Sequence, residues 1–100
     1  MVQHIVMWKL NDSLEGKNKE TLGKELKSQL LLLKEKIKEI VTLEVGLNSA
    51  YPERNHDIVL VITFKNFADL DVYAKHPEHV KVVEFVRSIT HSRSAVDYEY

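Results

Sequence analysis

The chain has 100 residues, 44% hydrophobic and 29% charged, which suffices for one compact core but not for two. Lys and Arg number 14 against 15 Asp and Glu, so the net charge of -1 excludes the basic surface typical of proteins that bind nucleic acid or anionic lipid. Cysteine is absent, which excludes disulfides and a thiolate nucleophile. The longest aliphatic run, Leu30 to Leu33, is too short to span a bilayer, and the N-terminus lacks the features of a signal peptide. We therefore expect a single cytoplasmic domain over residues 1–100, with no nucleic-acid or membrane partner.

The first half of the chain predicts a strand, a helix and a second strand. Residues 4–10 are apolar on both faces at their centre, which predicts a strand covered on both sides, and residues 11–13 then predict a turn and a helix cap. Leucines at steps of four and three predict an amphipathic helix over residues 17–39, with Leu31 off its apolar stripe and exposed. Alternating residues 40–48 predict a half-buried strand.

The second half predicts a loop, a strand, a broken helix and a last strand. Residues 49–56 are rich in turn formers, and residues 57–64 are again apolar on both faces. Residues 67–75 and 78–89 predict two helical pieces, because Pro77 disfavours helical geometry at His76 but suits the start of a new helix. A polar loop over residues 90–93 should then lead into a C-terminal strand with one wet face.

This order of elements predicts an α+β fold of the ferredoxin-like β-α-β-β-α-β type with an antiparallel sheet. The first and third strands, apolar on both faces, should lie at its centre. Two helices cover only one face, so one parity of the central strands stays exposed in a monomer. We expect a second copy to cover that face, with Val6, Ile58 and Leu60 among the buried residues, and to enclose a barrel-like interior.

Four segments resemble the stress-responsive dimeric A/B barrel (Dabb) family. They are HIVMWKL at the N-terminus, VGLN from Val45, YAKHPEHV from Tyr73 and AVDYE from Ala95, and the third is the most specific. The resemblance spans essentially the whole chain. It implies a ferredoxin-like protomer that forms a homodimer through its sheet, an α+β barrel. Known members include a plant polyketide cyclase, olivetolic acid cyclase, and stress-induced proteins without assigned chemistry.

The resemblance also implies which residues carry a cyclase-like reaction. His79 aligns with the base of the cyclase and Tyr73 with its hydrogen-bond donor, and both chemistries suit neutral pH. His4 would project into the same cavity beside Val6 and Trp8, where it would orient a substrate oxygen or form a hydrogen bond with the region of His79. Such proton transfer needs no cofactor.

The third strand departs from the cyclase. It presents Ile58 and Leu60 toward the expected cavity, and the cyclase has a histidine where Ile58 stands. One polar group of the cavity is therefore missing, so we expect a different substrate.

Structural roles compete with these assignments. His76 before Pro77 is expected to cap the helix, His79 is equally compatible with a structural role, and Tyr73 lies at core spacing from Phe67 and Leu70. His56 and His91 are expected at the surface. No spacing of a recognised metal site occurs, so we expect no metal.

Three functions remain open on these grounds. The first is a dimer whose barrel cavity binds a small apolar or aromatic metabolite, with cofactor-free proton transfer by His79 and Tyr73. The second is a non-catalytic stress-response or assembly protein in which side chains fill the interior and Trp8 closes it. The third is a cofactor-free monooxygenase-like barrel, which would need a polar triad that the sequence does not place.

Overall fold

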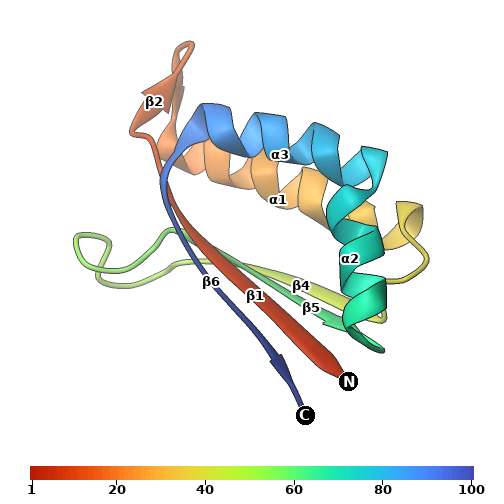
Figure 1. The fold of residues 1–100 in the computed structure, drawn as a ribbon. Coiled ribbons are helices and arrows are strands. Elements are labelled where there is room, and N and C mark those ends of the chain that lie inside the picture. Colours follow the sequence, from red (N-terminus) through yellow and green to blue (C-terminus); the bar gives the residue numbers. More distant parts are fainter.

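The computed structural model describes residues 1–100 and consists of one four-stranded sheet, a small hairpin and three helices on one face of the sheet (Figure 1). The strands and helices are β1 (Val2–Leu10), β2 (Ser13–Leu14), β3 (Lys17–Asn18), α1 (Lys19–Lys36), β4 (Thr42–Leu47), β5 (Ile58–Phe64), α2 (Phe67–Lys75), α3 (Pro77–Ile89) and β6 (Thr90–Glu99). No helix has the length and apolar character needed to cross a membrane.

The sheet has the order β4-β5-β1-β6, and all neighbouring strands are antiparallel. This confirms the predicted ferredoxin-like α+β fold, with the first and third main strands at the centre. Both central strands are apolar on both parities, as predicted, and the helices cover one of these parities (Figure 1). The outer strand β4 alternates, as predicted.

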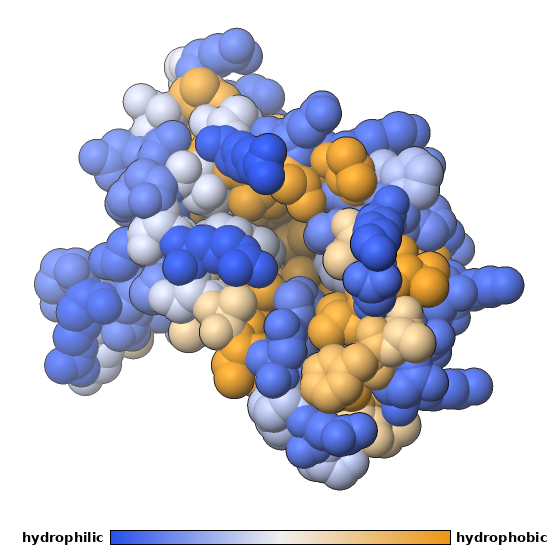
Figure 2. Space-filling view, in the orientation of Figure 1, coloured by the Kyte–Doolittle hydropathy of each residue, from blue (hydrophilic) through white to orange (hydrophobic).

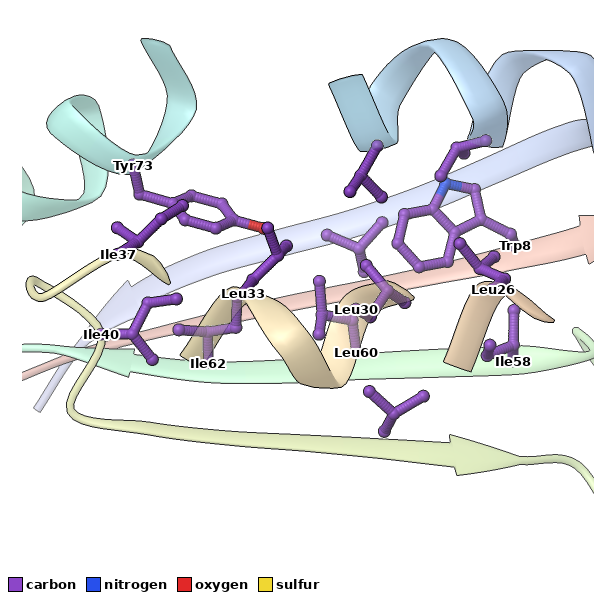
Figure 3. Packing of buried hydrophobic residues seen from close by; sticks show 14 of the residues in the cluster. Trp8, Leu26, Leu30, Leu33, Ile37, Ile40, Ile58, Leu60, Ile62 and Tyr73 are labelled. Atoms are coloured by element: carbon purple, nitrogen blue, oxygen red, sulfur yellow. The ribbon is translucent and has the colours of Figure 1, made fainter. Parts of the chain in front are cut away.

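The helix-facing side of the sheet forms the core. Leu26, Leu30 and Leu33 of α1 pack over Ile58, Leu60 and Ile62 of β5, as Figure 3 shows. Each of these six side chains is at most 2% exposed. Their burial supplies the main driving force for folding, because stability from apolar burial grows with the area removed from water.

This packing shows that the predicted dimer surface was wrong. Val6, Ile58 and Leu60 are each 2% exposed, because the helices of the same chain cover them, and Trp8 on the same parity is 6% exposed. A strand that is apolar on both parities gives no sequence signal for which parity meets the helices. The sequence therefore predicted an uncovered face but assigned it to the wrong set of residues.

The uncovered face carries the opposite parity and is apolar at its centre; we call it the outer sheet face. Met7, Val96 and Tyr98 on this face are 38%, 52% and 44% exposed. Ile5 lies between Val61 and Val96 in the register, and Met7 lies opposite Val59. No helix covers this side of the sheet (Figure 1).

Helix α1 begins later and ends earlier than the predicted span of residues 17–39. Its N-cap is Asn18, whose side-chain oxygen accepts a hydrogen bond of 2.9 Å from the backbone N–H of Thr21. The predicted cap at residues 11–13 is therefore wrong. A tight turn intervenes, with Gly16 at φ +81°, and joins β2 to β3 before the helix starts. Leu31 is 44% exposed, as predicted.

The break between α2 and α3 lies where Pro77 predicted it. His76 has extended backbone geometry, and its Nδ1 accepts a hydrogen bond of 3.1 Å from the backbone N–H of Glu78. His76 is thus the N-cap of α3, and Pro77 occupies the first position of that helix, where a missing N–H costs nothing.

Strand β6 is longer than predicted. Residues 90–93 are not a loop but pair with β1, with Thr90 opposite Leu10 and Arg93 opposite Trp8. A polar sequence lacks the apolar alternation that marks a strand, but its backbone can still complete the hydrogen bonds of a neighbouring long strand. The chain therefore turns directly from α3 into the sheet.

Candidate functional site

A cavity of about 520 Å³ lies between the helices and the sheet of one chain. In Figure 2 it is the central hollow, with apolar atoms at its bottom and hydrophilic side chains around it. Its walls come from β1, α1, β5, α2, α3 and the start of β6. The sequence led us to expect a cavity enclosed between two sheets of a dimer. It lies instead within one chain, because the parity of β1 that carries His4, Val6 and Trp8 faces the helices.

The structure brings together most of the residues predicted for the site. The cavity is lined by His4, Val6, Trp8, Leu60, Tyr73 and His79. Ile58 does not line it. Its side chain is packed in the core, 2% exposed, in register between Trp8 and Leu47.

The rings of Tyr73 and His79 lie against each other in a tilted arrangement and both line the cavity. Their centroids are 4.3 Å apart and their planes meet at 38°. Phe64 and His4 complete the group, with centroids 5.2 Å and 5.9 Å from the Tyr73 ring. Tyr73 comes from α2, His79 from α3, and the other two from the central strands, so four elements fix the positions of these rings.

The hydrogen bond of His79 defines which of its nitrogens is a base. Its Nδ1 lies 3.0 Å from the backbone oxygen of Ala74, and a carbonyl oxygen can only accept. Nδ1 therefore donates its proton, and in the neutral ring the lone pair is on Nε2. Burial lowers the pKa of His79 below its ordinary value of 6.5, outweighing the hydrogen bond to Ala74, so the neutral form dominates at pH 7.

The Tyr73 hydroxyl keeps its proton and faces the cavity. The side chain is 2% exposed, and burial raises the pKa of the phenol above its ordinary value of 10. The chain contains no buried polar side-chain atom without a partner, and no protein group bonds this hydroxyl, so its oxygen must be in contact with the cavity space. Figure 3 shows the oxygen on the side of the ring that faces Trp8. The hydroxyl is thus free to donate to a ligand.

Asp97 joins the site through His4 and was not foreseen from the sequence. Its carboxylate accepts a hydrogen bond from Nδ1 of His4, which is 8% exposed. This fixes the tautomer of His4 and leaves Nε2 available to a ligand. The sheet order places β1 beside β6, and the pairing of His4 with Asp97 depends on the register, which only the folded sheet defines.

The start of β6 adds a second unforeseen group of polar residues. Arg87, His91 and Arg93 line the cavity, although residues 90–93 were expected to form a loop; His91 is exposed, as predicted. His91 also contacts Asn11, with Nδ1 3.1 Å from Oδ1. Pairing of Arg93 with Trp8 turns its side chain toward the helices, because cross-strand partners share a face. His56 lies outside the cavity, 3.4 Å from Ser94.

The fold and the cavity define a class of protein: a ferredoxin-like protomer of the α+β barrel type, with a histidine-lined pocket between its helices and sheet. The chain belongs to the Stress responsive A/B Barrel Domain (Dabb) family, whose sequence profile matches residues 2–100. Among curated proteins, none matches the sequence at a significant level.

Solved structures share this fold. A dimeric protein of unknown function and ferredoxin-like fold from Bacteroides fragilis is 37% identical, with 99% of this chain and 95% of that chain covered and a TM-score of 0.86. A dimeric ferredoxin-like protein of unknown function from Thermobifida fusca is 19% identical, with coverages of 99% and 90% and a TM-score of 0.83. Hydroxynitrile lyase from Passiflora edulis is 15% identical, with coverages of 97% and 90% and a TM-score of 0.79. The latter two likenesses concern the fold alone.

Proposed function

We propose that the chain binds a small apolar or aromatic molecule in its cavity and catalyses cofactor-free proton transfer at a carbon next to a carbonyl group. The observation that carries this proposal is the pairing of His79 with Tyr73 at a cavity wall. One ring offers an unprotonated Nε2 and the other offers a protonated hydroxyl, 4.3 Å apart between centroids. A base and a donor at this separation can act on neighbouring atoms of one ligand.

The reaction starts with His79. Nε2 takes a proton from the acidic carbon, and the electron pair of the broken C–H bond moves onto the carbonyl oxygen as an enolate. Tyr73 donates a hydrogen bond to that oxygen, where the negative charge develops, and such stabilisation is strong in an apolar site. The burial that raises the pKa of Tyr73 keeps this donor protonated.

A cyclase-like second step needs no additional residue. The enolate carbon attacks a second carbonyl of the same ligand, a carbon-carbon bond forms, and the resulting alkoxide takes the proton back from His79. Atoms and charges then balance without a cofactor. The apolar wall of Val6, Leu60 and Val86 would hold the two reacting ends of the ligand close together.

His4 serves as a positioning and binding residue in this proposal. Asp97 holds Nδ1, so Nε2 of His4 can meet a ligand oxygen next to Tyr73. The cavity volume of about 520 Å³ falls within the range of ordinary small-molecule pockets, roughly 300–1,000 Å³. Trp8 is part of the wall and does not fill this space, which favours binding over the alternative of a purely structural protein.

We further propose that two copies pair through the outer sheet face. Met7, Val96 and Tyr98 present an apolar area without a covering helix, and the Bacteroides fragilis and Thermobifida fusca proteins are dimeric. Burial of such an area between two copies removes it from water. The cavity lies on the other side of the sheet, so each protomer would keep its own site.

Deuterium exchange into benzylacetone tests the proton transfer. Proton NMR in D₂O should detect exchange next to the ketone at a rate that rises with protein concentration. His79→Ala and Tyr73→Phe should each reduce the rate by about 100-fold. His56→Ala is the matched control and should leave the rate unchanged, because His56 lies outside the cavity. Equal rates for the parent and His79→Ala would overturn the assignment of the base.

A further inference from the structure

Two of the three arginines in the chain line the cavity. Arg87 lies in the last turn of α3, and Arg93 lies on β6 opposite Trp8. The third, Arg54, lies in the loop before β5 with its guanidinium 4.1 Å from the centre of the Tyr51 ring. Arginines are thus concentrated at a mainly apolar pocket, although the chain has a net charge of -1.

Neither cavity arginine is neutralised by the protein. The ion pairs of the chain all use Lys or His as the cation. The carboxylate on the cavity side of β6, Asp97, is already bonded to His4. Arg87 also complements the negative end of the α3 dipole, which is a structural role, but Arg93 in a strand has no such role. Arg87 and Arg93 thus line the cavity as exposed side chains, and neither guanidinium has a hydrogen-bonding or ion-pairing partner in the protein.

The arginines lie away from the proposed base: Arg87 is in the last turn of α3 whereas His79 is near its start, and Arg93 pairs with Trp8 of β1. His4 is near Tyr73 and His79, whereas Arg93 is opposite Trp8, four residues further along the strand. At about 3.3 Å per residue, these two positions on β1 are roughly 13 Å apart. The wall between them is apolar and includes Val6 and Leu60. The Arg93 charge also influences both rings, because it lowers the pKa of His79 and opposes the burial-induced rise in the pKa of Tyr73.

We propose that Arg87 and Arg93 bind an anionic group at one end of the ligand, so that the cavity selects an amphiphilic anion with an apolar body. This inference rests on the proposed small-molecule function and narrows its substrate class. A guanidinium presents a fork of N–H donors that matches a carboxylate or a phosphate. If the anionic group is held near Trp8, a carbonyl group of the same ligand roughly 13 Å away would reach Tyr73 and His79.

Calorimetric titration with matched probes tests this selection. Phenylbutyrate and its neutral isostere phenylbutyramide have the same apolar body, and the parent protein should bind the acid at least about tenfold more tightly. Arg93→Gln should weaken the binding of the acid by about tenfold and leave the affinity for the amide unchanged. Arg54→Gln removes the same charge outside the cavity and is the control, for which both affinities should match those of the parent.

Several outcomes would overturn the proposal. Equal affinity of the parent for acid and amide would reject anion selection while retaining the cavity as a binding site. If Arg93→Gln lowered the affinities for the acid and the amide equally, Arg93 would contribute to the shape of the pocket and not to binding of the anionic charge. Absence of binding for both probes in the parent would count against the anion site and small-molecule binding together. Phenylbutyl phosphate distinguishes the two anions: tighter binding than the acid, lost in Arg93→Gln, would identify a phosphate group as the ligand of the arginines.

Discussion

Tyr73 and His79 are six residues apart in the chain and belong to different helices, yet their ring centroids are 4.3 Å apart. On one continuous helix, six residues correspond to a rise of about 9 Å and to about 240° of rotation, so the two rings would point away from each other. The break at His76 and Pro77 redirects the chain, and the bond from His79 to Ala74 spans that break. Contact between the two rings is therefore a product of the kink.

Replacing Tyr73 by Phe separates the contribution of the packed ring to stability from that of the hydroxyl. The ring is 2% exposed, but the hydroxyl has no partner in the protein. We expect Tyr73→Phe to change the free energy of unfolding by less than about 0.5 kcal/mol, as for substitutions outside packing and hydrogen-bond networks. Tyr73→Ala, which removes the buried ring, should cost about 3–5 kcal/mol. Urea denaturation measures both. A cost above about 1 kcal/mol for Tyr73→Phe would mean that the hydroxyl is bonded within the fold.

His79 should make stability depend on pH in one defined direction. Burial lowers the pKa of His79 in the folded chain below its ordinary value of 6.5, so between these two pKa values the unfolded chain binds more protons. The free energy of unfolding due to this group therefore rises as the pH increases through that window and is constant above it. Denaturation of the parent and of His79→Asn at a series of pH values should give a difference that follows this curve. His56→Asn is the control, and a parent-minus-variant difference that falls with pH would contradict the assigned burial.

Glutamate substitutions on the two parities of β1 should have opposite consequences. Met7 on the outer sheet face is 38% exposed, so Met7→Glu should leave the fold intact and convert a dimer into a monomer of 11.6 kDa in analytical ultracentrifugation at micromolar concentration. Trp8→Glu buries a charge in the core and should unfold the chain.

An exposed residue away from the sheet provides the control for this pair. Val72 on α2 is 45% exposed, and Val72→Glu should change neither the fold nor the association state. A parent protein that sediments as a monomer would contradict pairing through the outer sheet face.

Asp97→Asn should impair the positioning of His4 without preventing ligand binding in the cavity. An amide has no charge to hold Nδ1–H of His4, so the ring can rotate or change tautomer. We expect the exchange rate of benzylacetone to fall by about tenfold, while its dissociation constant changes by less than about twofold. Glu99→Gln, two residues further along β6, is the matched control. Equal exchange rates for the parent and Asp97→Asn would exclude a positioning role.

Much of the site follows from local sequence signals. Pro77 with His76 predicted the helix break, and a break is a property of a few neighbouring residues. The resemblance pointed to Tyr73 and His79, and the fold places them together. Asp97 lies in the AVDYE segment of the resemblance but had no role assigned to it, and Arg93 lacked any signal. The positions of both depend on the register of β6 against β1, which is the outcome of pairing between strands 80 or more residues apart.

The sequence by itself determined the order of the main strands and helices, though not the β2–β3 hairpin, together with the ferredoxin-like topology and the need for an uncovered sheet face. Hydrophobic periodicity and turn residues act over short stretches of chain and therefore suffice for these features. Only the tertiary structure decided which parity of β1 and β5 meets the helices. Ile5, Val6, Met7 and Trp8 are all apolar, so both orientations bury hydrophobic side chains, and the choice depends on how the whole helix layer packs. That choice put the cavity inside one protomer and placed His4, Trp8 and the two arginines around it.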